Sequence, residues 1–382
     1  MLFAFIGGFG HYQPLVAVAR AAQRSGHTVA VAGSGNLQSV IIGDGFDAFP
    51  TSEPRIGPPP PEPLVKVDPN QLDWELRENF ARRGAQRHAA KLLELAREWQ
   101  PDIVIRDEVD FGAAVAAERL AIPCVNVLVL AAGGFLRKSV IAEPLHELRG
   151  AYGLPDDPEL AMLDGGLVLS PFPPSFRSPS VPLPAQAFSF RPGAVTRPNR
   201  AARRQAVYVT LGTVFNVPEL FARILEGLRA LPVDVVATVG EHVDPASFCP
   251  RNDHVRIERY IPQDEVLPRC DLVISHGGSG SVMGALGHGI PVVVMPLGAD
   301  QPYNARRVVE LGVGLELETS TVTPEAIRTA VEVILDDDRY RRAAGDIRDE
   351  INALSSPEET VPLLERLASR GDERPSRYAA PR

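Results

Sequence analysis

The 382-residue sequence is poor in cysteine, in long apolar runs and in excess positive charge. Its three cysteines, Cys124, Cys249 and Cys270, lie far apart and form no C-x-x-C pair, which argues against a disulfide framework and a cysteine metal site. A reducing cytoplasm is therefore the expected compartment. No stretch is long and apolar enough to span a bilayer, and no basic region precedes the short apolar run at the N-terminus, so we expect neither a membrane span nor a signal peptide.

The charge balance restricts the class of partner. The formal net charge is −9, and nucleic acid and anionic membranes attract basic surfaces, so neither is expected as the main partner. Hydrophobic residues make up 45% of the chain, which is enough apolar material for two globular cores.

Two halves of the sequence repeat one pattern of strands and helices. A strand over Leu2–Ile6, a helical period from Leu15 to Gly26 and a strand over Thr28–Ala32 form a β-α-β unit. The pattern restarts at Ala206–Leu211, after a stretch rich in proline, serine and arginine that is typical of a linker. The predicted fold class is α/β, with two Rossmann-like doubly wound domains that face each other across a cleft. Further strands are expected at Asp102–Ile105, Cys124–Leu130, Val233–Val239, Asp271–Ser275 and Pro291–Met295.

The first glycine-rich turn contains a histidine that is a candidate general base. Gly8-Phe9-Gly10 resembles a dinucleotide fingerprint, but Gln13 occupies the third glycine position, so the dehydrogenase interpretation is rejected. His11 lies between a strand end and a helix, where ligands bind in open α/β sheets. Its ordinary pKa of about 6.5 suits proton abstraction near neutral pH. The alternative is a hydrogen-bonded turn histidine without a catalytic role.

An orienting carboxylate would make His11 a better base. Asp107 stands just past the predicted strand 102–105, at the same edge of the sheet, and Asp110 is its rival one helical turn later. Both remain open as partners at this point.

A glycine-rich turn in the second half predicts an anion site. The run from His276 to Ser281 (His-Gly-Gly-Ser-Gly-Ser) follows a strand and opens a helix, so its N–H groups and the helix dipole favour negative charge. A tight strand–helix turn without a ligand is the alternative. The same edge is expected to carry the small turn Gly212-Thr213, the aromatic Tyr260 with its neighbour Ile261, and the polar pair Asp300 and Gln301.

These residues carry a resemblance to a known family. The stretch 260–314, together with Gly10-His11 and Pro14, resembles the family 1 GT-B glycosyltransferases of the actinobacterial natural-product type. The resemblance covers essentially the whole chain. It implies an acceptor-binding domain at 1–185, a linker at 186–204 and a nucleotide-sugar-binding domain at 205–355. A C-terminal helix at 356–370 would cross back to the first domain, and 371–382 would form a tail.

The resemblance also implies roles for individual residues. His11 matches the catalytic base and Asp107 its carboxylate partner, in an inverting reaction that needs neither a metal nor a cofactor. The diphosphate site corresponds to His276, Gly277, Gly278, Ser279, Gly280 and Ser281, with Gly212 and Thr213 assisting. Tyr260 would stack on the nucleotide base, Ile261 would read the edge of the base, and Asp300 and Gln301 would contact the donor sugar.

One departure from the family pattern concerns the donor nucleotide. Many UDP-using relatives have a ribose-binding glutamate three residues after the position of Ser281, where this chain has Gly284. A dTDP-sugar is therefore expected over a UDP-sugar. The acceptor, a small hydrophobic aglycone, would lie over His11 against Phe9, Phe111 and Phe135. A homodimer is possible on the sequence alone.

Two rival functions stay open at this stage. A nucleotide-sugar epimerase on the same scaffold would need no acceptor pocket. A non-catalytic partner of another transferase could lose the base without penalty. The presence of His11, Asp107 and the glycine-rich turn argues against such a partner.

Overall fold

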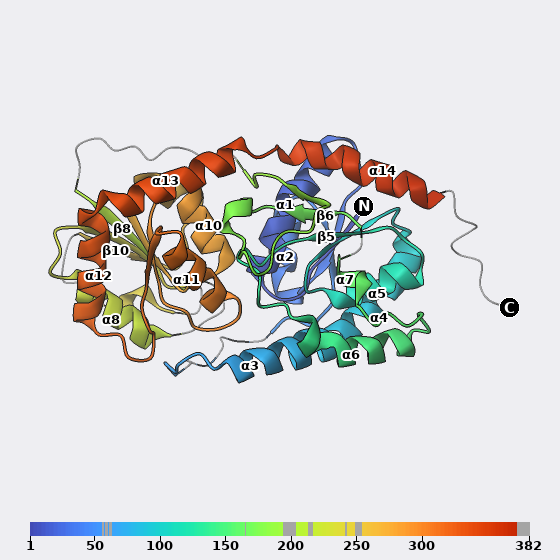
Figure 1. Ribbon diagram of the computed structural model, residues 1–382, viewed down its shortest axis with the longest axis horizontal. Coiled ribbons are helices and arrows are strands. Elements are labelled where there is room, and N and C mark those ends of the chain that lie inside the picture. Colours follow the sequence, from blue (N-terminus) through green and yellow to red (C-terminus); the bar gives the residue numbers. More distant parts are fainter. Residues whose placement is uncertain are drawn as a thin grey trace.

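The structure is a computed structural model, and it describes residues 1–55, 57, 60, 63–164, 166–193, 204–212, 217–240, 243–248 and 254–372. Two lobes lie side by side, each a parallel sheet between layers of helices (Figure 1). This arrangement confirms the predicted fold class of two doubly wound α/β domains.

The first lobe has a seven-stranded parallel sheet in the order β3-β2-β1-β4-β5-β6-β7. Its strands are β1 Leu2–Ala4, β2 Ala30–Gly33, β3 Asp47–Pro50, β4 Val104–Asp107, β5 Cys124–Val127, β6 Val168–Ser170 and β7 Ala187–Ser189. Its helices are α1 Phe9–Arg24, η1 Gly35–Leu37, α2 Gln38–Gly43, α3 Pro69–Trp74, η2 Glu75–Gly84, α4 Ala85–Trp99, α5 Phe111–Arg119, α6 Lys138–Ala151, α7 Ala161–Asp164 and η3 Pro174–Phe176.

The second lobe has a six-stranded parallel sheet in the order β10-β9-β8-β11-β12-β13. Its strands are β8 Ala206–Thr210, β9 Asp234–Thr238, β10 Val255–Glu258, β11 Leu272–Ser275, β12 Val292–Val294 and β13 Gly314–Glu316. Its helices are α8 Pro218–Leu228, η4 Pro245–Phe248, α9 Gln263–Val266, η5 Leu267–Arg269, α10 Ser279–Gly287, α11 Gln301–Glu310, α12 Pro324–Asp336 and α13 Asp338–Ala353.

The strand order makes β1 equivalent to β8 and β4 equivalent to β11, so the first glycine-rich turn follows β1 and the second follows the counterpart of β4. β1 pairs with β2 on one side and β4 on the other, and β8 is flanked in the same way by β9 and β11. The central strands are almost wholly buried because helices cover both faces, as expected for parallel sheets. The carboxyl ends of β1 and β4 therefore share one edge, and so do those of β8 and β11.

The chain returns to the first lobe at its C-terminus. After α13 come η6 Pro357–Thr360 and α14 Val361–Asp372, which lies along α1 (Figure 1). Ion pairs fix this return: Arg24 contacts Glu358 at 2.5 Å, and His27 lies 3.0 Å from Glu365.

The expected linker needs one correction. β7 lies inside 186–204, and it pairs with β6, so the first sheet continues through Ser189. Proline and serine around this short, half-buried edge strand masked its period. Residues 194–203, the rest of that expected linker, and 373–382, most of the expected tail, lie outside the described residues.

Among the described residues, none of the helices combines the length and the apolarity that crossing a bilayer requires.

Candidate active site

His11 and Asp107 come together at the carboxyl edge of the first sheet. His11 lies in the first turn of α1, and its Nδ1 is 3.3 Å from Oδ2 of Asp107, the last residue of β4. The same carboxylate accepts backbone N–H bonds from Ile6 at 2.8 Å, Val109 at 2.7 Å and Asp110 at 2.8 Å. These three bonds fix the buried carboxylate, so Asp107 can orient the imidazole.

The surroundings of His11 favour its protonated form. Burial lowers the pKa of His11, but the carboxylates of Asp107, Asp300 and Glu108 raise it, and the net pKa lies above the ordinary value. The His11 side chain is 21% exposed, whereas Asp107 is fully buried. Because Nδ1 faces Asp107, Nε2 is the ring nitrogen left to meet an incoming hydroxyl.

Asp110, the rival partner, is engaged elsewhere. Its Oδ2 lies 3.1 Å from Nδ1 of His88, a buried histidine of α4, and its Oδ1 caps α5 by accepting the Ala113 N–H at 3.0 Å. The structure therefore decides between the two candidate partners of His11: Asp107 contacts it, and Asp110 contacts His88 instead. No sequence pattern indicated His88, because along the chain it lies within a helix, far from any strand end.

An aromatic row leads from His11 towards the second lobe. The ring of Phe80, from η2, stacks on His11 with centroids 5.9 Å apart. Phe135 packs edge-on against Phe80 at 6.4 Å and against Tyr303 of α11 at 6.5 Å. η2 is a π-helix, a form that is frequent at functional sites, and sequence reasoning missed both it and Phe80.

The expected acceptor wall is only partly supported. Phe9 is half-buried beside His11, and Phe135 is 3% exposed in the aromatic row. Phe111 is fully buried in the core, as are all the residues of the first two turns of α5, 111–117. Phe111 therefore does not line an accessible wall, and that expectation is wrong.

The glycine-rich turn of the second lobe has the form of an anion cradle. Gly278 is the N-cap of α10, and no cap side chain bonds to the described first turn, so its N–H groups keep their capacity for a ligand. Gly277 adopts a φ of +87°, a conformation that favours glycine. Gly280 is exposed and Ser281 is half-buried.

The His276 ring lies tightly between Gly278 of this cradle and Gly212, which follows β8. A Cβ added to Gly212 would stand 2.7 Å from the His276 ring, and one added to Gly278 would stand 2.5 Å from it. Burial lowers the pKa of His276 to about 4, although a hydrogen bond with the Thr210 backbone partly offsets this. The imidazole is therefore neutral at pH 7, and it carries a single N–H rather than a positive charge.

The hydroxyl of Ser279 is used within the protein. It donates to Asp300 Oδ2 at 2.6 Å and accepts from the backbone N–H of Ala131 at 2.8 Å and from Asn304 at 3.1 Å. Asn304 Oδ1 accepts the Ala132 N–H at 3.1 Å. This hydroxyl therefore joins the two lobes, and the part of Ser279 that belongs to the cradle is its backbone N–H.

The remaining expected residues have mixed surroundings. Gln301 is buried, and its Oε1 accepts N–H bonds from Leu297 at 2.7 Å and Gly298 at 3.0 Å. Tyr260 is 61% exposed, which leaves its ring accessible to a nucleotide base, while the neighbouring Ile261 is buried. Thr213 lies outside the described residues.

The cradle and the base face each other across the contact between the lobes. The Gln13 amide oxygen, two residues after His11, lies 3.2 Å from the position that a Cβ on Gly280 would take. The mutual electrostatic influence of His11 and Asp300 spans the same gap. The arrangement thus places the His11–Asp107 pair opposite the N–H groups at the start of α10.

Comparisons with known proteins agree with this geometry. Over 94% of its length the chain is 30% identical to 10-deoxymethynolide desosaminyltransferase of Streptomyces venezuelae, and the match covers 95% of that protein. The chain belongs to the family 1 GT-B glycosyltransferases of the actinobacterial natural-product type. Residues 222–367 of the glycosyltransferase also match the family model described as erythromycin biosynthesis protein CIII-like, C-terminal domain.

Solved structures resemble the glycosyltransferase over nearly the whole chain. Spinosyn rhamnosyltransferase SpnG complexed with thymidine diphosphate is 26% identical, with a TM-score of 0.76 and coverage of 95% of this chain and 99% of that one. Glycosyltransferase VinC in complex with dTDP is 25% identical, with a TM-score of 0.73 and coverage of 97% and 100%.

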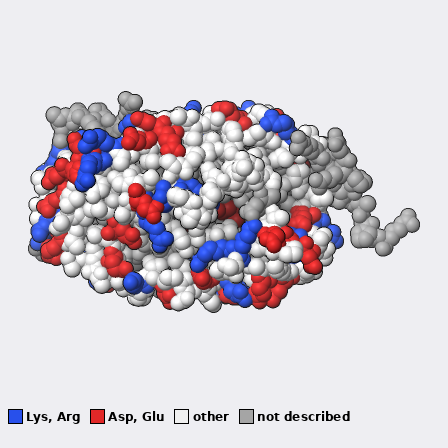
Figure 2. Space-filling view, viewed as in Figure 1, with Lys and Arg blue, Asp and Glu red and all other residues white. Residues whose placement is uncertain are grey.

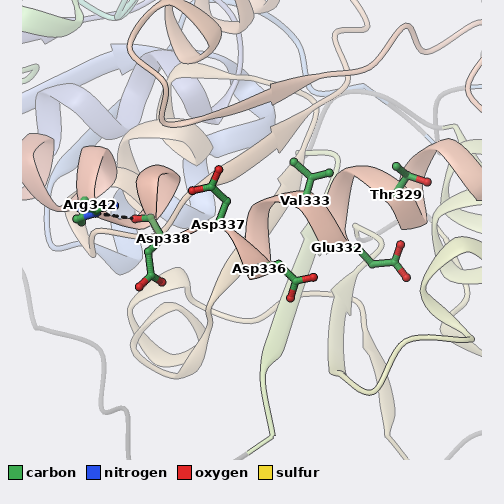
Figure 3. Close-up of a pocket in the computed structure, with 7 residues that line it drawn as sticks. All are labelled: Thr329, Glu332, Val333, Asp336, Asp337, Asp338 and Arg342. Atoms are coloured by element: carbon green, nitrogen blue, oxygen red, sulfur yellow. Dashed lines mark hydrogen bonds between the residues drawn. The ribbon is translucent and has the colours of Figure 1, made fainter.

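A surface depression lies away from this site and has a structural explanation. It forms at the junction of α12 and α13 and is lined by Thr329, Glu332, Val333, Asp336, Asp337, Asp338 and Arg342 (Figure 3). Asp337 caps α13 by accepting the Arg339 N–H at 2.9 Å, and Asp338 pairs with Arg341 at 2.5 Å. These carboxylates serve a helix start at the surface.

Charge on the molecular surface is mixed. Figure 2 shows acidic and basic side chains interspersed over the visible face, without an extended basic field of the kind that binds nucleic acid.

Proposed function

We propose that this glycosyltransferase transfers a deoxysugar from a dTDP-sugar to a hydroxyl of a small hydrophobic natural-product aglycone, with inversion at the anomeric carbon. The carrying observation is the His11–Asp107 pair at 3.3 Å, which lies opposite the glycine cradle at the start of α10. A general base on one side and an anion nest on the other suit a single displacement.

In the proposed step, Nε2 of His11 accepts the proton of the acceptor hydroxyl. The acceptor oxygen forms a bond to the anomeric carbon, and the bond from that carbon to the diphosphate oxygen breaks on the opposite face. The developing negative charge on the diphosphate is stabilised by the N–H groups of residues 279–281. In the proposed complex the neutral imidazole of His276 turns the N–H that bonds the Thr210 backbone towards the diphosphate. No metal and no cofactor take part in this proposal.

The donor sugar is proposed to lie near Asp300 and Gln301. Burial raises the pKa of Asp300, whereas hydrogen bonds from Ser279 and Asn304 and the charge of His11 oppose that rise. The carboxylate has one oxygen in these bonds, and the other oxygen remains for a sugar hydroxyl in the proposed complex.

The preference for dTDP is supported by the space around Gly284. A Cβ at that position would stand 2.4 Å from Oε1 of Gln263, so the amide fills the place that a ribose-binding glutamate would need. The structural relatives SpnG and VinC were solved with thymidine diphosphate or dTDP. We therefore expect a higher kcat/KM for dTDP-glucose than for UDP-glucose, and the reverse ranking would refute the preference.

The direct test is product analysis with dTDP-sugars and a panel of hydrophobic aglycones. Mass spectrometry should show the mass of one sugar added, and NMR should show the opposite anomeric configuration to that of the donor. A donor that is isomerised without any acceptor would instead support an epimerase. Binding of dTDP without transfer to any member of the panel would favour a non-catalytic partner.

A further inference from the structure

A second buried histidine–carboxylate pair lies beside the first. His88 Nδ1 is 3.1 Å from Asp110 Oδ2, and His88 Nε2 is 2.9 Å from the hydroxyl of Thr51. The three side chains are 2%, 0% and 3% exposed, so no substrate reaches them. The proposed transfer step does not use this set, and a buried polar chain is costly unless each member is satisfied.

The second pair is joined to the first through the turn between β4 and α5. The Asp110 N–H donates to Asp107 Oδ1 at 2.8 Å, and the Asp110 side chain is held by His88 and by the Ala113 N–H. Asp110 is thus fixed at both its main chain and its side chain. A shift of Asp110 would therefore weaken one of the N–H bonds that orient the carboxylate of Asp107.

Close packing links α4 rigidly to this turn. A Cβ added to Gly112 would stand 2.4 Å from the Ala85 carbonyl oxygen and 2.7 Å from Cβ of His88. The two helices therefore approach each other at backbone distance. The side chain of His88 is the polar connection in an otherwise apolar contact between α4 and the start of α5.

We propose that His88 is a positioning residue for the transfer reaction: through Asp110 it holds Asp107, and through Asp107 it holds the imidazole of His11. The inference rests on the proposed role of His11 as the base. The His11–Asp107 separation of 3.3 Å is already long for a hydrogen bond, so a small shift of the turn weakens it markedly.

The charged groups around His11 determine the expected readout. Asp107 and Glu108 face it from the end of β4, Asp300 faces it from the second lobe, and the Phe80 ring from η2 carries no charge. Since Asp107 raises the pKa of His11 by charge and by hydrogen bonding, a displaced Asp107 should let that pKa fall.

The experiment compares His88→Gln and Thr51→Val with the wild-type full-length enzyme. NMR titration of the ¹⁵N-labelled imidazoles should show a lower pKa for His11 in His88→Gln, and a smaller decrease in Thr51→Val. The kcat for sugar transfer should fall several-fold in His88→Gln, its acidic limb should move to lower pH, and the Kd for dTDP should stay unchanged.

A matched control separates positioning from general loss of stability. Tyr208→Phe removes another buried hydrogen bond, 2.8 Å to Thr238 in the second lobe, and should leave the pKa of His11 unchanged. An unchanged His11 pKa in both His88→Gln and Thr51→Val would overturn the inference. If His88→Gln does not fold, Thr51→Val alone decides it. If the His11 pKa shifts in His88→Gln while His11→Ala keeps full transfer activity, the proposed role of His11 as the base is refuted. The structural link between His88 and His11 would still stand.

Discussion

The two lobes each place a histidine at a glycine-rich turn between a strand and a helix, yet the two imidazoles have opposite electrostatics. His11 follows β1, lies against the carboxylate of Asp107 and has a raised pKa. His276 follows β11, lies between Gly212 and Gly278, and has a pKa of about 4. Similar local sequence thus supports opposite shifts of the imidazole pKa.

The difference comes from residues that are distant in the sequence. Asp107 is 96 positions from His11, and the sheet topology brings them together by pairing β1 with β4. In the described surroundings of His276, burial dominates instead. A general base works best when its pKa lies near the working pH. A hydrogen-bond donor to a diphosphate can instead stay neutral over the whole working range of pH.

The largest expected effect is on the catalytic side of this comparison. His11→Ala should lower kcat by roughly 10²- to 10⁴-fold, the usual contribution of a general base. The affinity for dTDP, measured by calorimetry, should survive because the cradle is in the other lobe. His27→Ala is the control, since His27 also pairs with a carboxylate, Glu365, but lies away from the site. Comparable transfer by His11→Ala and wild type would remove the mechanism.

The second effect concerns the stability that the neutral His276 confers. A folded-state pKa of about 4 against an unfolded value of 6.5 corresponds to about 3 kcal/mol that is present above pH 6.5 and lost as the pH falls towards 4. Urea unfolding at pH 7 and pH 4 should show a smaller acid loss for His276→Gln than for the wild-type enzyme. Equal losses would mean that His276 titrates normally in the folded state.

The third effect tests whether Asp107 creates the contrast. Asp107→Asn should reduce kcat by roughly 10- to 100-fold, less than His11→Ala, because the base remains but loses its charged partner. The acidic limb of the pH–rate profile should move to lower pH, since Asp107 raises the pKa of His11. A limb that stays in place would assign the raised pKa to Asp300 and Glu108 instead.

The smallest effect sharpens the other side of the comparison. Gly278→Val should weaken dTDP binding by at least about tenfold, or about 1.4 kcal/mol. The reason is that a Cβ there would stand 2.5 Å from Nε2 of His276 and force the ring out of the cradle. Gly150→Val is the control, because no atom lies within 4 Å of a Cβ at that helical position. The NMR pKa of His11 should not respond to either change.

Much of the fold follows from sequence pattern. The strands at and near the centres of both sheets are mostly apolar, so β1, β2, β4, β8, β9 and β11 were predicted close to their observed bounds. The edge strands β3, β7 and β10 carry half-buried or exposed residues with weak periods, and the sequence did not reveal them. The π-helical turn of η2 also has no pattern that separates it from an ordinary helix.

The site residues that lie at or just after strand ends were predictable from the sequence. His11, Asp107 and the cradle from His276 all follow strands, so the topology alone brings each group to an edge of its sheet. Side-chain direction was not predictable in the same way. The hydroxyl of Ser279 turns to Asp300, and Phe111 turns into the core, because buried tertiary partners decide both.

The N–H groups of Ala131 and Ala132 join the first lobe to Ser279 and Asn304 of the second lobe. Main-chain donors are common to every amino acid except proline, but both alanine side chains are only 1% exposed, so the attachment also requires small side chains. Exchange of either alanine for serine or glycine should therefore keep the lobes docked, whereas a bulky apolar residue there should push them apart although its N–H donor remains.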